Sequence, residues 1–181
     1  MHPAKHLHFG GISKSVCLCG FAMTSYVSGC FPRLKSHGNV CKILASFPYV
    51  ILHTKYFMDK GWHTVRYDDL IEGKYLYNRC HLIAYMLTGQ NDNQLNLITG
   101  TRYMNVEGML PWEIKVYDHI EETGDRVLYR VTPVYDGHDL VAKGVLMEAQ
   151  SLDGALSFCV FCYNIQPGIR IDYSDGCSER T

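Results

Sequence analysis

The chain has 181 residues, of which 47% are hydrophobic and 19% charged, so it can bury the core of one folded domain and does not have the composition of a disordered protein. Its 17 basic and 18 acidic residues give a net charge of −1. A protein that coats nucleic acid stably through a broad cationic surface is normally basic, so the composition disfavours that class but permits an enzyme with a local cationic groove.

Residues 1–60 carry no sustained hydrophobic period, and we treat them as a poorly defined N-terminal segment. Their most apolar stretch, 16–27, is too short to span a membrane and is closer in length to the apolar core of a signal peptide. It runs into a Val-Ser-Gly-Cys sequence that ends at Cys30 and is typical of a lipoprotein leader. Two interpretations stay open: an ordinary buried segment, or a leader to about residue 30 on a secreted or cell-surface bacterial protein.

Eight cysteines are many for a cytosolic chain of this size. A zinc site built on a cysteine pair needs a second pair or histidines at ligand distance, and Cys159 and Cys162 have no such companion in the sequence. Both also fall in an alternating apolar segment, where residues three apart point to opposite faces of a strand. The scattered cysteines and histidines of the N-terminal segment leave a zinc-stabilised domain as an alternative.

From Trp62 onward the hydrophobic patterns become regular. Alternation of apolar and polar residues predicts half-buried strands over 62–67 and 75–81. The polar, Asn-rich stretch 88–96 has too few apolar residues for a core element. Its length predicts a functional loop between two structured elements.

The strongest helix signal lies between Pro111 and Gly124, because proline suits the first helical turn and glycine the residue after the last one. Its apolar residues form a stripe that is expected to face the core: Ile114, Val116, Tyr117 and Ile120.

Three strands are predicted after the helix, over 127–135, 140–150 and 156–165. Turns rich in Asp and Gly separate them, at 136–139 and 153–154. This order predicts an antiparallel meander preceded by one main helix and a long loop. The fold class is therefore α+β.

His81 stands at the end of a predicted strand, two residues after Arg79, so both side chains are expected on one face of that strand. The charge of a guanidinium disfavours protonation of a neighbouring imidazole. A neutral histidine beside an arginine that binds phosphate is what general-base attack on a phosphodiester needs. A lone histidine is more often structural, so this hypothesis depends on Arg79 as its neighbour.

Two asparagines, Asn96 and Asn105, lie between apolar residues, where a polar side chain needs a partner. Carboxamide oxygens combined with water suit Mg²⁺. Glu113, early in the predicted helix, either binds a metal-bound water or interacts with the positive end of the helix dipole, and both interpretations stay open. Asn91 and Asn93 fit ordinary turn chemistry.

Three motifs follow one another along this part of the chain: Tyr77-Asn78-Arg79-Cys80-His81-Leu82-Ile83, Asn96-Leu97-Ile98-Thr99-Gly100-Thr101-Arg102-Tyr103-Met104-Asn105 and Gly108-Met109-Leu110-Pro111-Trp112-Glu113. In this order they resemble the DNA/RNA non-specific endonucleases, and among them the branch of streptococcal secreted DNases and DNA-entry nucleases. The resemblance covers residues 61–176. It implies a nuclease domain over that range, with a ββα-metal (His-Me finger) core.

The resemblance also implies an activity and a set of roles. The activity is metal-dependent, sugar-non-specific hydrolysis of phosphodiester bonds in DNA, with RNA as a further substrate and Mg²⁺ as the ion, for which Mn²⁺ can substitute. The implied roles are a general base at His81, a phosphate contact at Arg79, a metal ligand at Asn105, a holder of metal-bound water at Glu113, and site-shaping or substrate-binding residues at Asn78, Asn96 and Arg102.

Two positions depart from the D-R-G-H motif of the family, since Asn78 replaces the acid and Cys80 the glycine. A neutral Asn78 orients its neighbours through hydrogen bonds rather than charge. Cys80 alternates to the face opposite Arg79 and His81, so it is not expected to block the site or to act as a nucleophile. These departures keep a second hypothesis open, a catalytically inactive nucleic-acid-binding or interaction module with the same fold.

Overall fold

The structure is a computed structural model that describes residues 61–181 together with two short strands nearer the N-terminus, Thr24–Tyr26 (β1) and Cys41–Ala45 (β2). The leader-like stretch, apart from the backbone of β1, lies outside the described residues. The zinc-binding alternative for the N-terminal cysteines and histidines falls outside them as well.

A five-stranded antiparallel sheet forms one layer, with its strands in the order β1-β7-β6-β5-β2. Its centre is the meander of β5 (Val127–Val134), β6 (Gly144–Ser151) and β7 (Ser157–Tyr163), which confirms the three strands predicted after the helix. β1 pairs with β7 and β2 pairs with β5. Residues from the N-terminal segment therefore complete both edges of this sheet.

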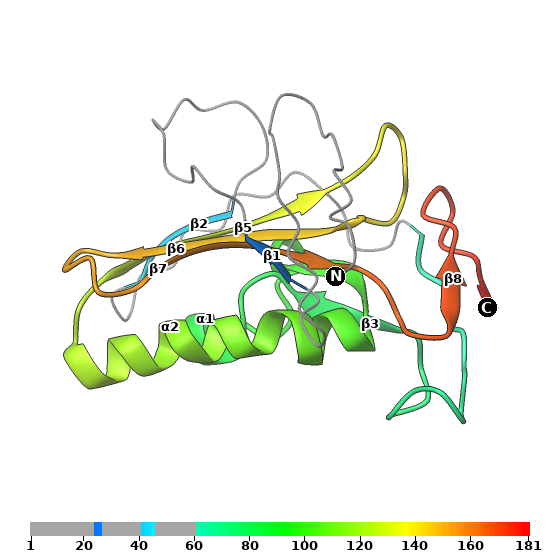
Figure 1. Ribbon diagram of the computed structural model, residues 1–181, viewed down its shortest axis with the longest axis horizontal. Helices are drawn as coiled ribbons and strands as arrows, with labels where there is room; N and C mark the ends of the chain where they lie inside the picture. The colour runs from blue at the N-terminus through cyan, green and yellow to red at the C-terminus, as the bar shows by residue number, and fades with distance from the viewer. Residues whose placement is uncertain (1–23, 27–40, 46–60) are drawn as a thin grey trace, which may run out of the picture.

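One main helix, α2 (Leu110–Thr123), lies along one face of the sheet (Figure 1). Pro111 stands in its first turn, where a proline removes no hydrogen bond. Gly124 ends it in the left-handed conformation, with φ of 67°, and donates its N–H to Ile120 O at 2.8 Å. The predicted bounds of the helix are confirmed.

The apolar stripe predicted for this helix wrongly includes Ile114. Ile114 is 41% exposed, whereas Val116 and Ile120 are buried together with Trp112. The buried positions recur every four residues, which keeps them on one face of a helix, and Ile114 lies between them on the outer face. The core between α2 and the sheet is therefore centred on the 112, 116 and 120 positions.

A separate two-stranded hairpin precedes α2 and pairs β3 (Tyr77–His81) with β4 (Leu97–Thr101). The connection between them contains one short helix, α1 (Tyr85–Thr88), and a 3-10 turn, η1 (Gln94–Asn96), with the predicted polar loop between the two. After β4 the chain enters α2 through a π-helical turn, η2 (Met104–Met109), which no sequence pattern predicted. The order β3, β4, α2 confirms the predicted α+β fold with a ββα core.

The strand predicted over 62–67 is not formed. In this segment Arg66 makes an isolated bridge to Tyr75, because the chain folds back on itself between them. The segment packs on the second two-stranded sheet, β8 (Ile169–Ile171) and β9 (Ser178–Arg180), through a small core. Its buried members are Tyr67, Ile71, Leu76, Tyr77, Ile169 and Ile171. Within this segment only Tyr67 is buried, and Trp62 and Val65 are half-buried against the small core.

The two cysteines of β7 point to opposite faces, as predicted from their spacing. Cys162 belongs to the core between the sheet and α2, where its thiol lies 3.4 Å from Gly108 O. Cys159 is buried outside that core and is disulfide-bonded. The pair therefore does not form a joint zinc site.

Asn164 joins the β3–β4 hairpin to the large sheet. Its side chain is completely buried, and its Oδ1 accepts a hydrogen bond from Thr101 N at 2.8 Å. Its Nδ2 donates to Thr99 O at 3.2 Å and to Ala142 O at 3.0 Å. One carboxamide thus fixes β4 against the segment that leads into β6.

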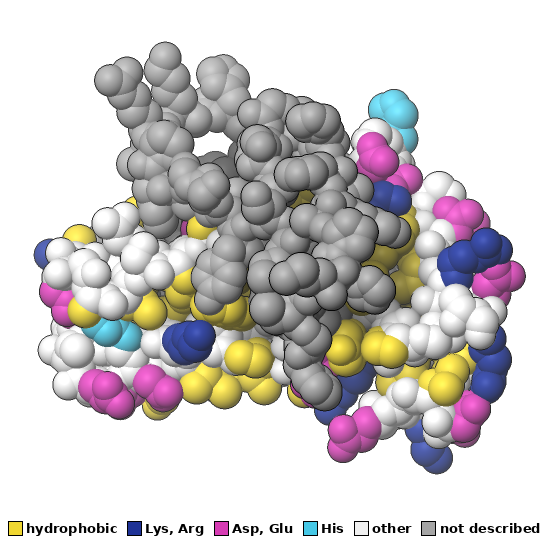
Figure 2. Space-filling view, viewed as in Figure 1, with side chains coloured by type: hydrophobic (Ala, Val, Ile, Leu, Met, Phe, Trp, Pro, Cys, Tyr) yellow, Lys and Arg dark blue, Asp and Glu magenta, His cyan; other side chains and the backbone are white. Residues whose placement is uncertain are grey.

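Both signs of charge are interspersed at the end of the molecule that carries β8 (Figure 2). Arg180 pairs with Asp69 at 2.6 Å, and Arg170 pairs with Glu179 across β8 and β9. These pairs locally neutralise basic side chains, which fits the near-zero net charge. Across 61–181, no helix combines the length and the apolar character that crossing a bilayer requires.

We expect Ile120→Ala to lower the free energy of unfolding by about 2–4 kcal/mol, because it opens a cavity between α2 and the sheet. The matched control is Ile114→Ala on the same helix, which removes the same atoms from an exposed site and should cost less than about 1 kcal/mol. Urea denaturation measures both. Equal losses for the two variants would contradict the observed orientation of α2.

Asn164→Ala should lower the free energy of unfolding by about 2–4 kcal/mol, because it leaves Thr101 N, Thr99 O and Ala142 O without their buried partner. Asn91→Ala is the control, since the Asn91 side chain is exposed. Thermal unfolding followed by circular dichroism compares the two. A stable Asn164→Ala protein would show that this carboxamide does not hold the hairpin.

Candidate active site

His81 ends β3, opposite Leu97 of β4, and its ring is half-buried. Its Nε2 lies 3.0 Å from the main-chain oxygen of Asn91. A carbonyl oxygen only accepts hydrogen bonds, so this partner assigns the ring hydrogen to Nε2 and leaves the lone pair on Nδ1. Asn91 belongs to the polar loop after α1, and the loop thus fixes both the orientation and the tautomer of the imidazole.

Asn105 lies in the π-helical turn η2 and contacts β3 through its side chain. The thiol of Cys80 lies 3.1 Å from Asn105 Oδ1. Burial raises the pKa of this thiol, and the charge of Glu113 raises it further, so the sulfur keeps its hydrogen and donates it. A carboxamide oxygen has two lone pairs, so one remains for a cation. Asn105 is thereby held against the residue that precedes His81.

Glu113 lies in the first turn of α2 and is 4% exposed. Its Oε1 accepts a hydrogen bond from Ala84 N at 2.8 Å, three residues after His81. Burial raises the pKa of this carboxyl to about 8, although the hydrogen bond from Ala84 opposes the shift. A buried carboxylate needs positive charge or hydrogen bonds to remain ionised. The position fits a cation beside it, and also allows an interaction with the helix dipole.

Asn96 is completely buried, and both ends of its carboxamide bind the backbone of one residue. Its Oδ1 accepts from Ile83 N at 3.0 Å, and its Nδ2 donates to Ile83 O at 2.8 Å. Ile83 lies two residues after His81. Asn96 therefore holds the chain that leaves β3 and supports the site through the backbone.

Arg79 and Asn78 lie on opposite faces of β3. Arg79 is exposed, with its guanidinium 5.9 Å from the centre of the Trp62 ring. Cys80 is 1% exposed, which confirms that it alternates away from Arg79 and His81. Asn78 shares the face of Cys80, and its buried Nδ2 has no hydrogen-bond partner among the residues that the structure describes.

Arg102 lies at the other end of the hairpin from His81. It follows β4, and its backbone N–H donates to Leu76 O, just before β3. Each strand of the hairpin has five residues, a length of about 13–17 Å. The contacts of Asn96, Asn105 and Glu113 lie in the segment 80–84, at the end of β3 that carries His81. The side chain of Asn105 packs on the Cys80 face of β3, opposite His81, and the backbone of Arg102 lies at the other end of the hairpin.

Three partners that fix this arrangement have no signal in the sequence. They are the main-chain oxygen of Asn91, the main-chain nitrogen of Ala84 and the thiol of Cys80. Alternation along β3 correctly assigns Cys80 to the face away from His81. It does not show that Asn105 packs on that same face, because the two residues are far apart along the chain.

The family model described as DNA/RNA non-specific endonuclease matches residues 30–153 of this chain. A curated deoxyribonuclease from Streptococcus dysgalactiae subsp. equisimilis is 37% identical over 107 residues, which are 56% of this chain and 32% of that protein. The chain therefore spans about a third of the length of this curated relative.

Two solved structures resemble the fold. The Sda1 nuclease with a bound zinc ion is 40% identical, with a TM-score of 0.56 over 60% of this chain and 46% of that one. NucA from Streptococcus agalactiae with a magnesium ion bound has a TM-score of 0.68 at 24% identity, and the match covers 98% of this chain and 90% of that one. At 24% identity, the similarity to NucA shows a shared fold. This fold is that of the ββα-metal nucleases.

The family match covers more than half of the chain and includes the hairpin β3–β4, η2 and α2, which carry the candidate site. The same three motifs on which the resemblance was based lie inside it. By this match, and by its ββα core, the chain belongs to the DNA/RNA non-specific endonuclease family.

Proposed function

We propose that the protein is a metal-dependent endonuclease that hydrolyses phosphodiester bonds of DNA, and also of RNA, without reading base sequence. The observation that carries this proposal is that the segment 80–84, which contains His81, is contacted by Asn105 through Cys80 and by Glu113 through Ala84, while Asn91 orients the imidazole. Family membership and the name of the deoxyribonuclease relative support it. They do not favour the alternative of an inactive interaction module.

His81 acts as the general base in this proposal. Its Nε2–H is engaged by the main-chain oxygen of Asn91, so Nδ1 is the atom that accepts a proton from the attacking water. The loop that supplies this oxygen keeps the ring in place during the transfer. General-base assistance of this kind contributes about 10²–10⁴-fold to the rate.

Asn105 and Glu113 fit a hard divalent cation, because their donor atoms are a carboxamide oxygen and a carboxyl oxygen that combine well with water. A cation near Glu113 would also stabilise the ionised form of a carboxyl that burial disfavours. We assign Mg²⁺, with Mn²⁺ as a substitute. When bound, the ion supplies positive charge that stabilises the phosphate and the leaving 3′ oxygen in the transition state.

Arg79 is proposed to contact the substrate phosphate, since its guanidinium is exposed on the strand that carries His81. Contacts with phosphate do not depend on base identity, which explains weak sequence preference. Arg102, at the far end of the hairpin, is proposed to bind a more distant part of the same strand of nucleic acid. Asn78 and Asn96 shape the site, Asn96 through its hold on Ile83.

We further propose that the protein is secreted or held on the surface of a bacterial cell. The composition of the stretch 16–27 is that of a leader, although β1 within it pairs with β7 as part of the sheet. The disulfide at Cys159 supports it as well, because such bonds persist in oxidising compartments. In this proposal the nuclease domain comprises residues 61–176. β1 and β2, which precede this range, form the edge strands of its large sheet.

His81→Ala should abolish nicking of supercoiled plasmid in Mg²⁺, with a loss of at least about 100-fold, because it removes the proton acceptor. The variant should keep the wild-type circular dichroism spectrum, since the ring is half-buried at the end of a strand. His138→Ala, at an exposed turn between β5 and β6, is the matched control and should cleave normally. Wild-type rates in His81→Ala would reject the proposed base, and wild-type cleavage in EDTA would reject metal dependence.

Asn105→Ala should raise the Mg²⁺ concentration needed for half-maximal nicking by about tenfold or more, because it removes a ligand oxygen. High Mg²⁺ should then partly restore the rate. Asn91→Ala is the control, because its contribution to His81 comes from the main chain and survives the substitution. An unchanged Mg²⁺ dependence in Asn105→Ala would exclude this residue as a ligand.

A further inference from the structure

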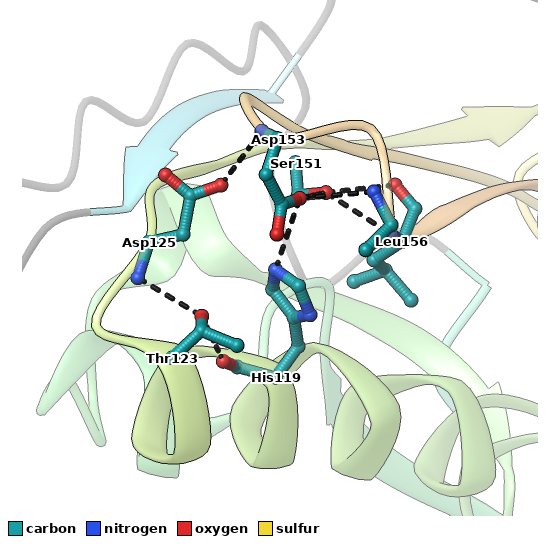
Figure 3. Close-up of polar contacts among 7 residues, drawn as sticks. His119, Thr123, Asp125, Ser151, Asp153 and Leu156 are labelled. Atoms are coloured by element: carbon teal, nitrogen blue, oxygen red, sulfur yellow. Dashed lines mark hydrogen bonds and ion pairs between the residues drawn. The ribbon is translucent and has the colours of Figure 1, made fainter.

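A cluster of three metal-ligating side chains lies at the C-terminal end of α2. His119 comes from the last two turns of α2, Asp125 from the connection to β5, and Asp153 from the turn between β6 and β7 (Figure 3). One ligand atom of each residue lies within 4.8 Å of the others. His119 is six residues beyond Glu113, about 9 Å along the helix, so the cluster is separate from the candidate active site.

The imidazole of His119 is buried beside Asp153 without a hydrogen bond to it. Its Nε2 is buried and has no hydrogen-bond partner within the described part of the chain. Asp153 Oδ1 lies 3.6 Å from it, beyond the usual N–H···O distance. Two ligands of a tetrahedral Zn²⁺, each about 2.1 Å from the ion, lie about 3.4 Å apart. The 3.6 Å spacing is close to this value, but Asp153 Oδ1 already accepts two hydrogen bonds. Asp153 Oδ2 is therefore the oxygen available to an ion, and a protonated His119 would form an ion pair with Oδ1.

Both carboxylates are oriented by hydrogen bonds. Asp153 Oδ1 accepts from Ser151 Oγ at 2.5 Å and from Ala155 N at 2.9 Å, and these two contacts hold the pKa of Asp153 below its usual value. Asp125 Oδ2 accepts from Asp153 N at 2.9 Å (Figure 3). Hydrogen bonds of this kind position the ligands of metal sites. A carboxylate has about four lone-pair sites, so Asp125 and the Oδ2 atom of Asp153 retain capacity for an ion.

We propose that His119, Asp125 and Asp153 bind a divalent first-row transition ion of the Zn²⁺ class. One imidazole nitrogen with two carboxylate oxygens suits Zn²⁺, whereas Mg²⁺ prefers an octahedron of oxygens that includes several waters. Asp153 is 43% exposed, so water has access as a fourth ligand. The ion connects the end of α2 to the β6–β7 turn and thereby stabilises the folded chain.

The test is a Zn²⁺ titration of the metal-stripped, full-length protein, followed by calorimetry and by melting temperature. The wild-type Tm should rise by about 5–10 °C at a hundredfold excess over the dissociation constant. His119→Gln should lose this rise and bind one Zn²⁺ fewer per chain. Asp125→Asn should do the same, while its amide oxygen still accepts from Asp153 N. Each variant is compared with itself in the absence of Zn²⁺, so an altered basal stability does not affect the result.

Two controls separate this site from any other zinc on the chain. His138→Gln, at an exposed histidine of the β5–β6 turn, should keep the full rise in Tm, whereas Asn105→Ala should lose only the part contributed by zinc at the candidate active site. Zinc bound elsewhere contributes equally to the wild type and to His119→Gln. The proposal is overturned if His119→Gln binds as many ions as the wild type with the same rise in Tm. It is also overturned if the wild type shows no rise, which would leave His119 and Asp153 as an ion pair.

Discussion

The burial of the Glu113 carboxyl is the constraint on which the candidate active site depends. The packing of α2 against the sheet places this group in the protein interior, where Ala84 N is its partner at 2.8 Å. Desolvation raises its pKa to about 8, so the metal-free protein loses stability as the pH rises from about 4.5 through about 8. An apolar side chain would carry no such penalty. Under the proposed function, a cation beside the carboxyl would offset this penalty and so link metal binding to the stability of the helix packing.

Carboxamides have two different roles around β3 and β4, and their partners distinguish them. Asn96 and Asn164 are completely buried and use both ends of the side chain on backbone groups, so they act as clamps. The oxygen of Asn105 accepts from the thiol of Cys80, which is a weak donor. A cation therefore meets little competition for that oxygen. Residue type alone does not separate these two environments, whereas the hydrogen-bond partners do.

The two proposed metal sites lie at opposite ends of α2. Its 14 residues extend over about 21 Å, with Glu113 in the first turn and His119 in the last two turns. The first end faces the hairpin that holds His81, and the second faces the β6–β7 turn. A rigid helix between them keeps the sites apart. An ion at the far end would fix the position of the helix that carries Glu113, and so support the active site without touching substrate.

Local patterns along the chain were enough to predict the meander, the bounds of α2 at Pro111 and Gly124, and, through the motifs, the residues of the candidate site. These features depend on short-range periodicity and on the backbone preferences of single residues. The packing of the elements sets which faces are buried, and it leaves 62–67 without the predicted strand. It alone brought Cys80 to Asn105 and assembled the His–Asp–Asp cluster. Contacts between residues far apart along the chain depend on how the layers pack, and no local pattern records that packing.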